Sequence, residues 1–200
     1  SSDLIIDRSI TLVKNSRAQL PITPQAHKRA ILYSVSSVSL AARVLGKADK
    51  AREYLAQELE KQGFSVEVYR LNPFKYLTPK GINGKKVLAD IPVLEFRKKY
   101  DVVFVIADVQ SFSTTNERNL HWSIPMGPEI PWYAAEKTTV FISVANPFHL
   151  YDVPMVPVCI NTYNGSREAI RQAVEKITGK SEFKGNSPVD AFCGMWDTRL

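Results

Sequence analysis

An uncharged apolar run at residues 138–145 constrains the fold of this chain more than any other segment. Seven of its eight residues are β-branched, aromatic or small apolar, which is typical of a strand buried on both faces. The run stops at Asn146-Pro147, because the residue before a proline is pushed out of helical geometry. Strands buried on both faces occur in parallel sheets covered by helices, and such sheets bind ligands at the carboxyl ends of their strands.

Further apolar segments predict an alternation of strands and helices. Strands are expected at 30–35, 64–69, 101–107, 138–145 and 155–161, and helices at 4–20, 44–62, 87–100 and 166–178. Gly63 and Gly179 are expected to end two of the helices, and Ser166 to cap the last one. Residues 71–86 predict a turn-rich loop, and residues 180–200 a tail packed over the body.

Strands that alternate with helices predict parallel strands joined by crossover helices. We therefore expect one domain over residues 1–200, an α/β fold of three layers (α/β/α) around a mostly parallel, flavodoxin-like sheet.

Composition narrows the function classes. The net charge of +6 favours a polyanion partner, but the Lys and Arg residues are dispersed over expected helix ends and faces, which argues against a nucleic-acid site. No run approaches the ~18 apolar residues that a membrane span needs. Cys159 lies in an apolar run and is expected to be buried. Cys159 and Cys193 form no C-x-x-C motif, and two cysteines do not show whether the protein works in an oxidising or a reducing compartment.

Common catalytic motifs are missing from the sequence. It has no G-x-G-x-x-G, Walker A, G-x-S-x-G or H-E-x-x-H pattern. Its histidines, His27, His121 and His149, lie far apart, without a carboxylate or cysteine at ligand spacing. We therefore expect neither a metal nor a cofactor.

The segment after the strand at 101–107 holds the best candidate site. It combines hydrogen-bonding side chains with an aromatic ring, and sugars need both, for their hydroxyls and for their apolar face. The candidates are Asp108, Gln110, Glu117, Arg118, His121 and Trp122. Asp108 and Glu117 are a conceivable acid/base pair. The alternative is a solvated loop with Trp122 in the core and both carboxylates in water.

Several segments, in order, resemble the C-terminal domain of glycoside hydrolase family 3 over nearly the whole chain. They are 9–15 with 19–22, 101–105, 145–150, 161–165, and 177–180 with 184–189. The closing segment 188–200 is similar to that of the bacterial β-N-acetylglucosaminidases. The resemblance implies the C-terminal domain of a retaining hydrolase that removes terminal β-linked N-acetylglucosamine.

The resemblance also implies where the catalytic groups lie. The nucleophilic Asp would be on an N-terminal (β/α)8 barrel, which needs roughly 250 residues and exceeds this chain. In the glucosaminidase branch an Asp–His dyad would lie there too, marked by a Gly-His-Gly stretch that this sequence lacks. In the β-glucosidase branch the acid/base Glu comes from the loop corresponding to 108–132, but Glu117-Arg118 lacks the glycine of that motif. This domain would buttress the barrel, and its 108–132 loop, with Asn146 and His149, would border the cleft.

The expected partners are therefore the barrel of the same polypeptide and a carbohydrate that contains N-acetylglucosamine. The apolar surface that faces the barrel predicts a possible homodimer of the isolated domain. The alternatives are a stand-alone carbohydrate- or protein-binding module, and a polyanion binder. The sequence leaves open whether the bacterial parent protein is cytoplasmic or exported.

Overall fold

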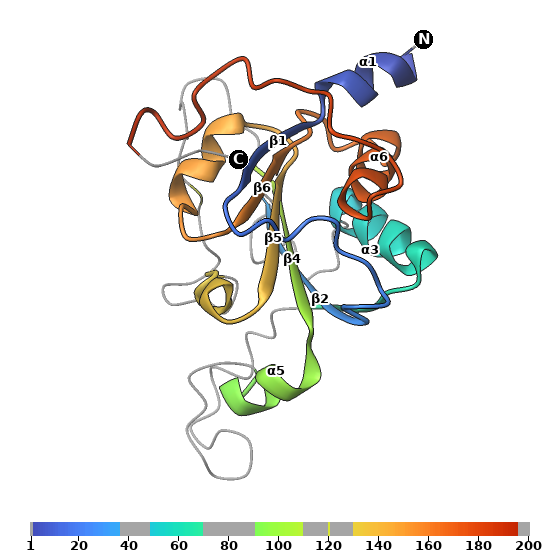
Figure 1. Cartoon of the computed structure of the whole chain (residues 1–200), viewed down its shortest axis with the longest axis vertical. Coiled ribbons are helices and arrows are strands. Elements are labelled where there is room, and N and C mark those ends of the chain that lie inside the picture. Colours follow the sequence, from blue (N-terminus) through green and yellow to red (C-terminus); the bar gives the residue numbers. More distant parts are fainter. Residues whose placement is uncertain (1, 37–48, 70–90, 110–119, 121–129, 196–200) are drawn as a thin grey trace.

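The computed structural model describes residues 2–36, 49–69, 91–109, 120 and 130–195. Its centre is a six-stranded sheet (Figure 1). Its strands, in the order β1-β6-β5-β4-β2-β3, are β1 (Thr11–Asn15), β6 (Val158–Asn161), β5 (Thr138–Ser143), β4 (Val102–Asp108), β2 (Arg29–Ser36) and β3 (Ser65–Val68). Neighbouring strands are parallel except β1, which is antiparallel to β6. The expected mostly parallel, flavodoxin-like sheet is confirmed, since strands β2 to β6 follow the 2-1-3-4-5 order.

Strand β4 lies at the centre and is buried on both faces. From Val102 to Ala107 no residue is more than 1% exposed. Phe104 and Ile106 point to one core, while Val105 and Ala107 point to the other. Burial on both faces explains why the strand is a continuous apolar run and does not alternate with polar residues.

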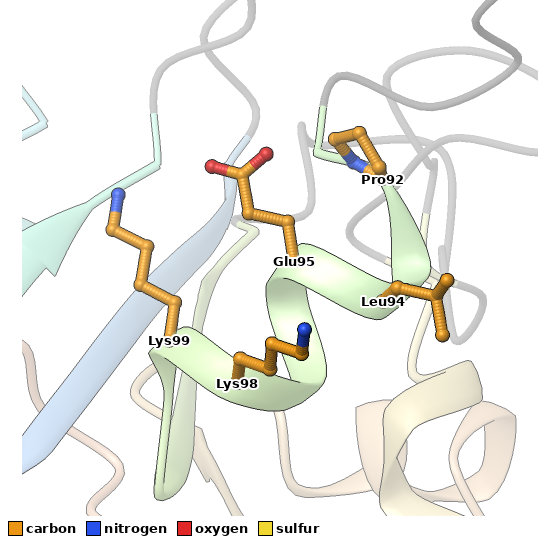
Figure 2. A pocket seen from close by; sticks show the side chains of 5 residues that line it. All are labelled: Pro92, Leu94, Glu95, Lys98 and Lys99. Atoms are coloured by element: carbon orange, nitrogen blue, oxygen red, sulfur yellow. The ribbon is translucent and has the colours of Figure 1, made fainter.

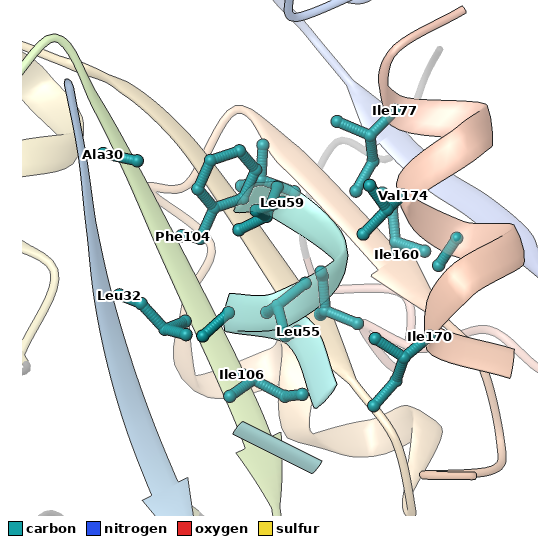
Figure 3. Packing of buried hydrophobic residues seen from close by; sticks show 14 of the residues in the cluster. Ala30, Leu32, Leu55, Leu59, Phe104, Ile106, Ile160, Ile170, Val174 and Ile177 are labelled. Atoms are coloured by element: carbon teal, nitrogen blue, oxygen red, sulfur yellow. The ribbon is translucent and has the colours of Figure 1, made fainter. Parts of the chain in front are cut away.

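Two helices, α3 (Lys50–Gln62) and α6 (Arg167–Ile177), cover one face, and α1 (Ser2–Ser9) packs on α6. Figure 3 shows Leu55 and Leu59 of α3 and Val174 of α6 packed over Phe104 of β4 and Ile160 of β6. The helix boundaries follow local chemistry. Asp49 accepts a hydrogen bond from the Arg52 N–H at 3.2 Å, and Ser166 from that of Ala169 at 3.3 Å. Gly63 ends α3 in the left-handed conformation, as expected.

The opposite face is covered by shorter elements and the tail. These are α5 (Val93–Lys99) and the 3₁₀ helices η2 (Trp132–Ala135) and η3 (Pro147–Asp152). Aromatic rings fill the space between them. Tyr133 stacks on Tyr33 with ring centres 5.1 Å apart, and Phe96 lies 5.0 Å from Trp132. Phe192 is fully buried there, so the described part of the tail, up to Met195, packs over the body as predicted.

The helix predicted for residues 4–20 is wrong in its second half. Helix α1 ends at Ser9, and β1 follows as an antiparallel edge strand on β6. The segment mixes apolar and basic residues, so a helical reading and a strand reading compete locally. The free edge of β6 decides between them, because a strand there pairs its backbone groups with those of β6.

Other boundaries were also displaced. Of the helix expected at 87–100, the structure describes α5, which runs from Val93 to Lys99 after an N-cap at Pro92. The strand expected at 155–161 begins at Val158. The loop at 71–86 and the start of the helix expected at 44–62 lie outside the described residues. None of the described helices has the length and apolar character needed to cross a bilayer.

A buried ion pair joins α1 to α6. The side chain of Lys176 is fully buried and donates to Asp7 Oδ1 at 2.5 Å and to the Glu182 carbonyl at 2.6 Å. The hydrogen bond from Lys176 holds the pKa of Asp7 below its ordinary value of 3.8. The pair therefore stabilises the fold above that value and loses its effect as the pH falls through the lowered pKa.

We predict that Asp7→Asn lowers the free energy of unfolding by about 2 kcal/mol at pH 7, because a charged hydrogen bond to a buried ammonium is lost. Urea unfolding of both proteins at pH 7 and pH 3 measures this, and the difference should shrink at pH 3. Asp3→Asn on the same helix is the control and should change little. An equal loss from both substitutions would contradict a specific role for the ion pair.

The tail crosses β1 at a glycine. A Cβ atom on Gly185 would lie 2.5 Å from the Ile10 carbonyl oxygen and 2.6 Å from Thr11 Oγ1. We predict that Gly185→Ala costs about 1–3 kcal/mol of stability through overpacking. Thermal unfolding of this variant beside Asn186→Ala, an exposed neighbour in the same tail, provides the comparison. Wild-type stability in Gly185→Ala would mean that the tail does not pack on β1 as described.

Candidate functional site

The sheet turns polar at its carboxyl edge. Ser36 ends β2 opposite Asp108, which ends β4, and Ser143 ends β5 opposite Asn161, which ends β6. The residues before them in these strands are mainly apolar and buried. This is the edge at which parallel α/β sheets bind ligands, and both Asp108 and the Asn146-Pro147 corner lie at it.

The polar residues divide between the two faces of the sheet. On the face covered by α3, Ser34 donates its hydroxyl to Asp49 Oδ2 at 2.7 Å, and Asp49 is only 5% exposed. Asp49 also caps α3, so its carboxylate is committed to structure. Side chains along β2 and β4 alternate between the two faces of the sheet. Asp108 lies on the same face as Ser34, because the chain neighbours of both residues belong to the core on the opposite face.

The second group lies on the opposite face, where β5 runs into η3. Ser143 Oγ donates to the Asn146 carbonyl oxygen at 2.7 Å and lies 3.3 Å from His149 Nδ1. The Asn146 side chain accepts the Phe148 N–H at 2.9 Å and so caps η3. The Asn-Pro corner is thus closed by a serine hydroxyl and a side-chain amide.

These contacts determine the protonation state of His149. The side chain is fully buried, and desolvation lowers its pKa from 6.5 to about 4, so the ring is neutral at pH 7. Since the one Ser143 hydroxyl hydrogen goes to Asn146, the oxygen must accept from Nδ1, which places the ring proton there. The Nε2 atom is then an acceptor, and it has no hydrogen-bond partner among the described residues.

Asn161 lies beside this group. It is fully buried, and neither its side-chain oxygen nor its nitrogen has a hydrogen-bond partner in the described part of the chain. A buried polar atom without a partner costs about 1–3 kcal/mol, so three such atoms on two residues that both lie next to Ser143 require an explanation.

Leu120, a described residue of the predicted 108–132 loop, is tied to η3. The Leu120 backbone N–H donates to Asp152 Oδ2 at 2.5 Å, and Leu120 is 7% exposed. The contact places Leu120 beside η3, the element that also holds His149.

Three of the predicted site residues lie in the described part of the chain. Asp108 ends β4, and Asn146 and His149 come together at the start of η3. Gln110, Glu117, Arg118, His121 and Trp122 lie outside the described residues, so their roles stay predictions. His149 is enclosed by the fold, and its role as a sugar contact also stays a prediction.

Ser143 and Asn161 were missed by the sequence analysis. The available signal was weak: Ser143 is the single interruption in the apolar run at 138–145, and Asn161 follows the apolar residues of β6. Only the register of β5 on β6 shows that the two are neighbours.

A shallow depression of about 500 Å³ lies elsewhere, along α5 (Figure 2). Its lining residues are Pro92, Leu94, Glu95, Lys98 and Lys99. They come from one helix that precedes β4, at the opposite edge from the polar strand ends, and Lys99 already pairs with Glu67 at 2.6 Å. The depression holds none of the predicted site residues. In the described ranges, no three His, Cys, Asp or Glu side chains gather as a metal site would require.

Cys159 is fully buried, as expected, and burial raises the pKa of its thiol to about 12. A thiol that stays protonated at neutral pH is not a nucleophile, so Cys159 contributes packing to the core.

Comparison with known proteins identifies the family. No family profile matches the chain. However, it is 34% identical over 194 residues to a β-N-acetylglucosaminidase/β-glucosidase of Cellulomonas fimi. The matched region covers 96% of this chain and 32% of that protein. The structure of the β-glucoside phosphorylase BglX matches 99% of the chain and 32% of its own length, at 33% identity and a TM-score of 0.77. The chain belongs to glycoside hydrolase family 3.

Within this family the chain corresponds to the C-terminal domain, and it spans about a third of the length of these relatives. The fold persists at low identity. A glycoside hydrolase family 3 β-N-acetylglucosaminidase from Paenibacillus sp. str. FPU-7 is 15% identical, with a TM-score of 0.58 over 92% of this chain and 31% of that one. The family resemblance and the α/β sandwich expected from the sequence are both confirmed.

The burial of His149 predicts a pH dependence of stability. Its pKa is about 4 in the folded state and near 6.5 when exposed, so the unfolded chain binds a proton first as the pH falls. Stability from the neutral ring is therefore complete above pH 6.5 and is lost between pH 6.5 and 4, by up to about 3 kcal/mol. Urea unfolding of wild type and His149→Gln across this range should show a steeper loss in the wild type. Parallel curves would mean that His149 titrates normally in the fold.

Proposed function

We propose that residues 1–200 are one domain, the C-terminal domain of a retaining glycosidase that removes terminal β-linked N-acetylglucosamine. The supporting observation is the 34% identity, across 96% of the chain, with a protein named for activity on β-N-acetylglucosaminides and β-glucosides. The relative is about three times as long as the match, which leaves room for a catalytic barrel in the remainder. The domain alone would be inactive.

Retention requires two carboxyl groups about 5–5.5 Å apart, one as nucleophile and one as acid and then base. At the described carboxyl edge, Asp49 is occupied by Ser34 and by the α3 cap. We place both catalytic groups on the barrel. This domain would contribute the border of the cleft, with Asp108, Gln110, Arg118, His121 and Trp122 after β4 and Asn146 and His149 after β5.

The barrel would also cover apolar surface. Leu4 and Ile5 on α1 are 50% and 72% exposed, and Leu94 on α5 is 69% exposed. Exposed apolar side chains of this kind mark interaction surfaces when they gather in patches. A partner in the same polypeptide, or a second copy of the isolated domain, would bury them.

A second candidate differs in the acceptor of the sugar. Two solved structures at 33% and 34% identity, matching 99% and 97% of the chain, are named β-glucoside phosphorylases. In phosphorolysis a phosphate oxygen, instead of water, would attack the glycosyl-enzyme, and the carboxylate would leave as the sugar 1-phosphate forms. The sugar could be glucose or N-acetylglucosamine in either reaction.

The decisive experiment uses the complete polypeptide that contains this chain. Its rate with 4-nitrophenyl β-N-acetylglucosaminide and β-glucoside is measured with and without inorganic phosphate, and products are analysed by ³¹P NMR. The primary proposal expects free N-acetylglucosamine at a rate independent of phosphate. Sugar 1-phosphate formed in proportion to phosphate would favour the second candidate, and no turnover of either glycoside would refute both.

The mass of the native polypeptide tests the remaining alternative. A band heavier by at least a barrel, detected with an antibody against this domain, is the expected result. A band at the 22.5 kDa of this chain would instead favour a stand-alone carbohydrate- or protein-binding module.

We predict that Arg118→Ala or Trp122→Ala in the complete enzyme lowers kcat/KM at least tenfold, since each would remove a sugar contact. Steady-state kinetics on the preferred glycoside measure the effect, with Lys180→Ala, an exposed residue beyond the last helix, as control. Unchanged kcat/KM in both variants would remove the segment after β4 from the site.

A further inference from the structure

Three buried polar atoms at the carboxyl edge have no hydrogen-bond partner among the described residues. They are Nε2 of His149 and both side-chain polar atoms of Asn161, and each residue is fully buried. Two neutral side chains, His149 of η3 and Asn161 of β6, thus have buried polar atoms without hydrogen bonds. Native interiors usually satisfy such atoms.

The two residues lie on the same face of the sheet. Ser143 and Asn161 are register partners on adjacent parallel strands, so their side chains emerge side by side about 5 Å apart. His149 Nδ1 lies 3.3 Å from Ser143 Oγ. The imidazole and the carboxamide are therefore both neighbours of the same hydroxyl.

The bonding capacities of the atoms specify the chemistry of a ligand. Nε2 can only accept in the neutral, Nδ1-protonated ring, the Asn161 oxygen accepts, and its amide nitrogen donates. A ligand that satisfies all three must donate twice and accept once. A water molecule does this and would make about three hydrogen bonds, the usual number for an internal water.

We propose that a structural water molecule is held between His149 and Asn161. It donates one hydrogen to Nε2 and the other to the Asn161 oxygen, and accepts from the Asn161 amide. A cation is disfavoured because a neutral imidazole and a carboxamide supply too few ligands and no charge. A sugar hydroxyl has the same bonding capacity, but the full burial of both side chains favours water.

The water would connect the ends of β5 and β6 with the turn between β5 and η3. Ser143 already binds that turn through the Asn146 carbonyl and His149. With the water in place, His149 is held on both ring nitrogens, and the turn is fixed to two strands instead of one. The inference does not depend on which glycoside the complete enzyme cleaves.

NMR and crystallography of the 200-residue chain without any sugar test the proposal. Long-range ¹H–¹⁵N spectra should show His149 neutral with the proton on Nδ1, and its ring should give cross-relaxation with a long-lived water. A crystal structure should show density within hydrogen-bond distance of Nε2 and of the Asn161 amide. A direct bond between the two side chains, or density only in crystals soaked with sugar, would overturn it.

A double-mutant cycle gives an independent measure. His149→Phe and Asn161→Leu should each lower the midpoint of urea unfolding, since each leaves the water and the remaining polar partner unsatisfied. The double variant removes the need for the water and should lose clearly less than the sum of the two shifts. The control pairs His149→Phe with Ile160→Val on the opposite face, for which the shifts should add. Additivity in both cycles would refute a shared water.

Discussion

The burial of β4 on both faces is the constraint from which the rest of the structure follows. A strand with no exposed side chain must pair its backbone on both sides, which it does with β2 and β5, and must be covered above and below. Helices α3 and α6 cover one face. The other is covered by α5, two 3₁₀ helices and the tail, with aromatic rings between them. Polar side chains can enter this framework only where the strands end.

The carboxyl edge shows how that restriction is used. On one face Asp49 serves both the α3 cap and the Ser34 hydroxyl, and on the other Ser143 serves both Asn146 and His149. Asp49 and Ser143 thus each join a strand to the helix that covers or follows it. Such links hold each turn in one position, which the proposed place of this domain at the border of a substrate cleft would require.

Family membership and chemistry rest on different parts of the molecule. The fold is retained in a family member at 15% identity, so the sandwich itself does not specify the substrate. Two relatives that match the chain at 34% and 33% identity are named a β-N-acetylglucosaminidase/β-glucosidase and a β-glucoside phosphorylase. The substrate is therefore selected by side chains near the reacting sugar and not by the fold of this domain.

The sequence by itself determined the elements with strong local signals. The apolar runs of β2, β4 and β5 and the caps at Ser166 and Gly63 were predicted correctly, because burial on both faces and capping leave a mark within a few residues. Five ordered segments also carried the family resemblance. Only the tertiary structure decided that residues 11–15 form an edge strand and that Ser143, His149 and Asn161 are neighbours. Those outcomes depend on strand register and on a free sheet edge, which join residues far apart in the chain and leave no local pattern.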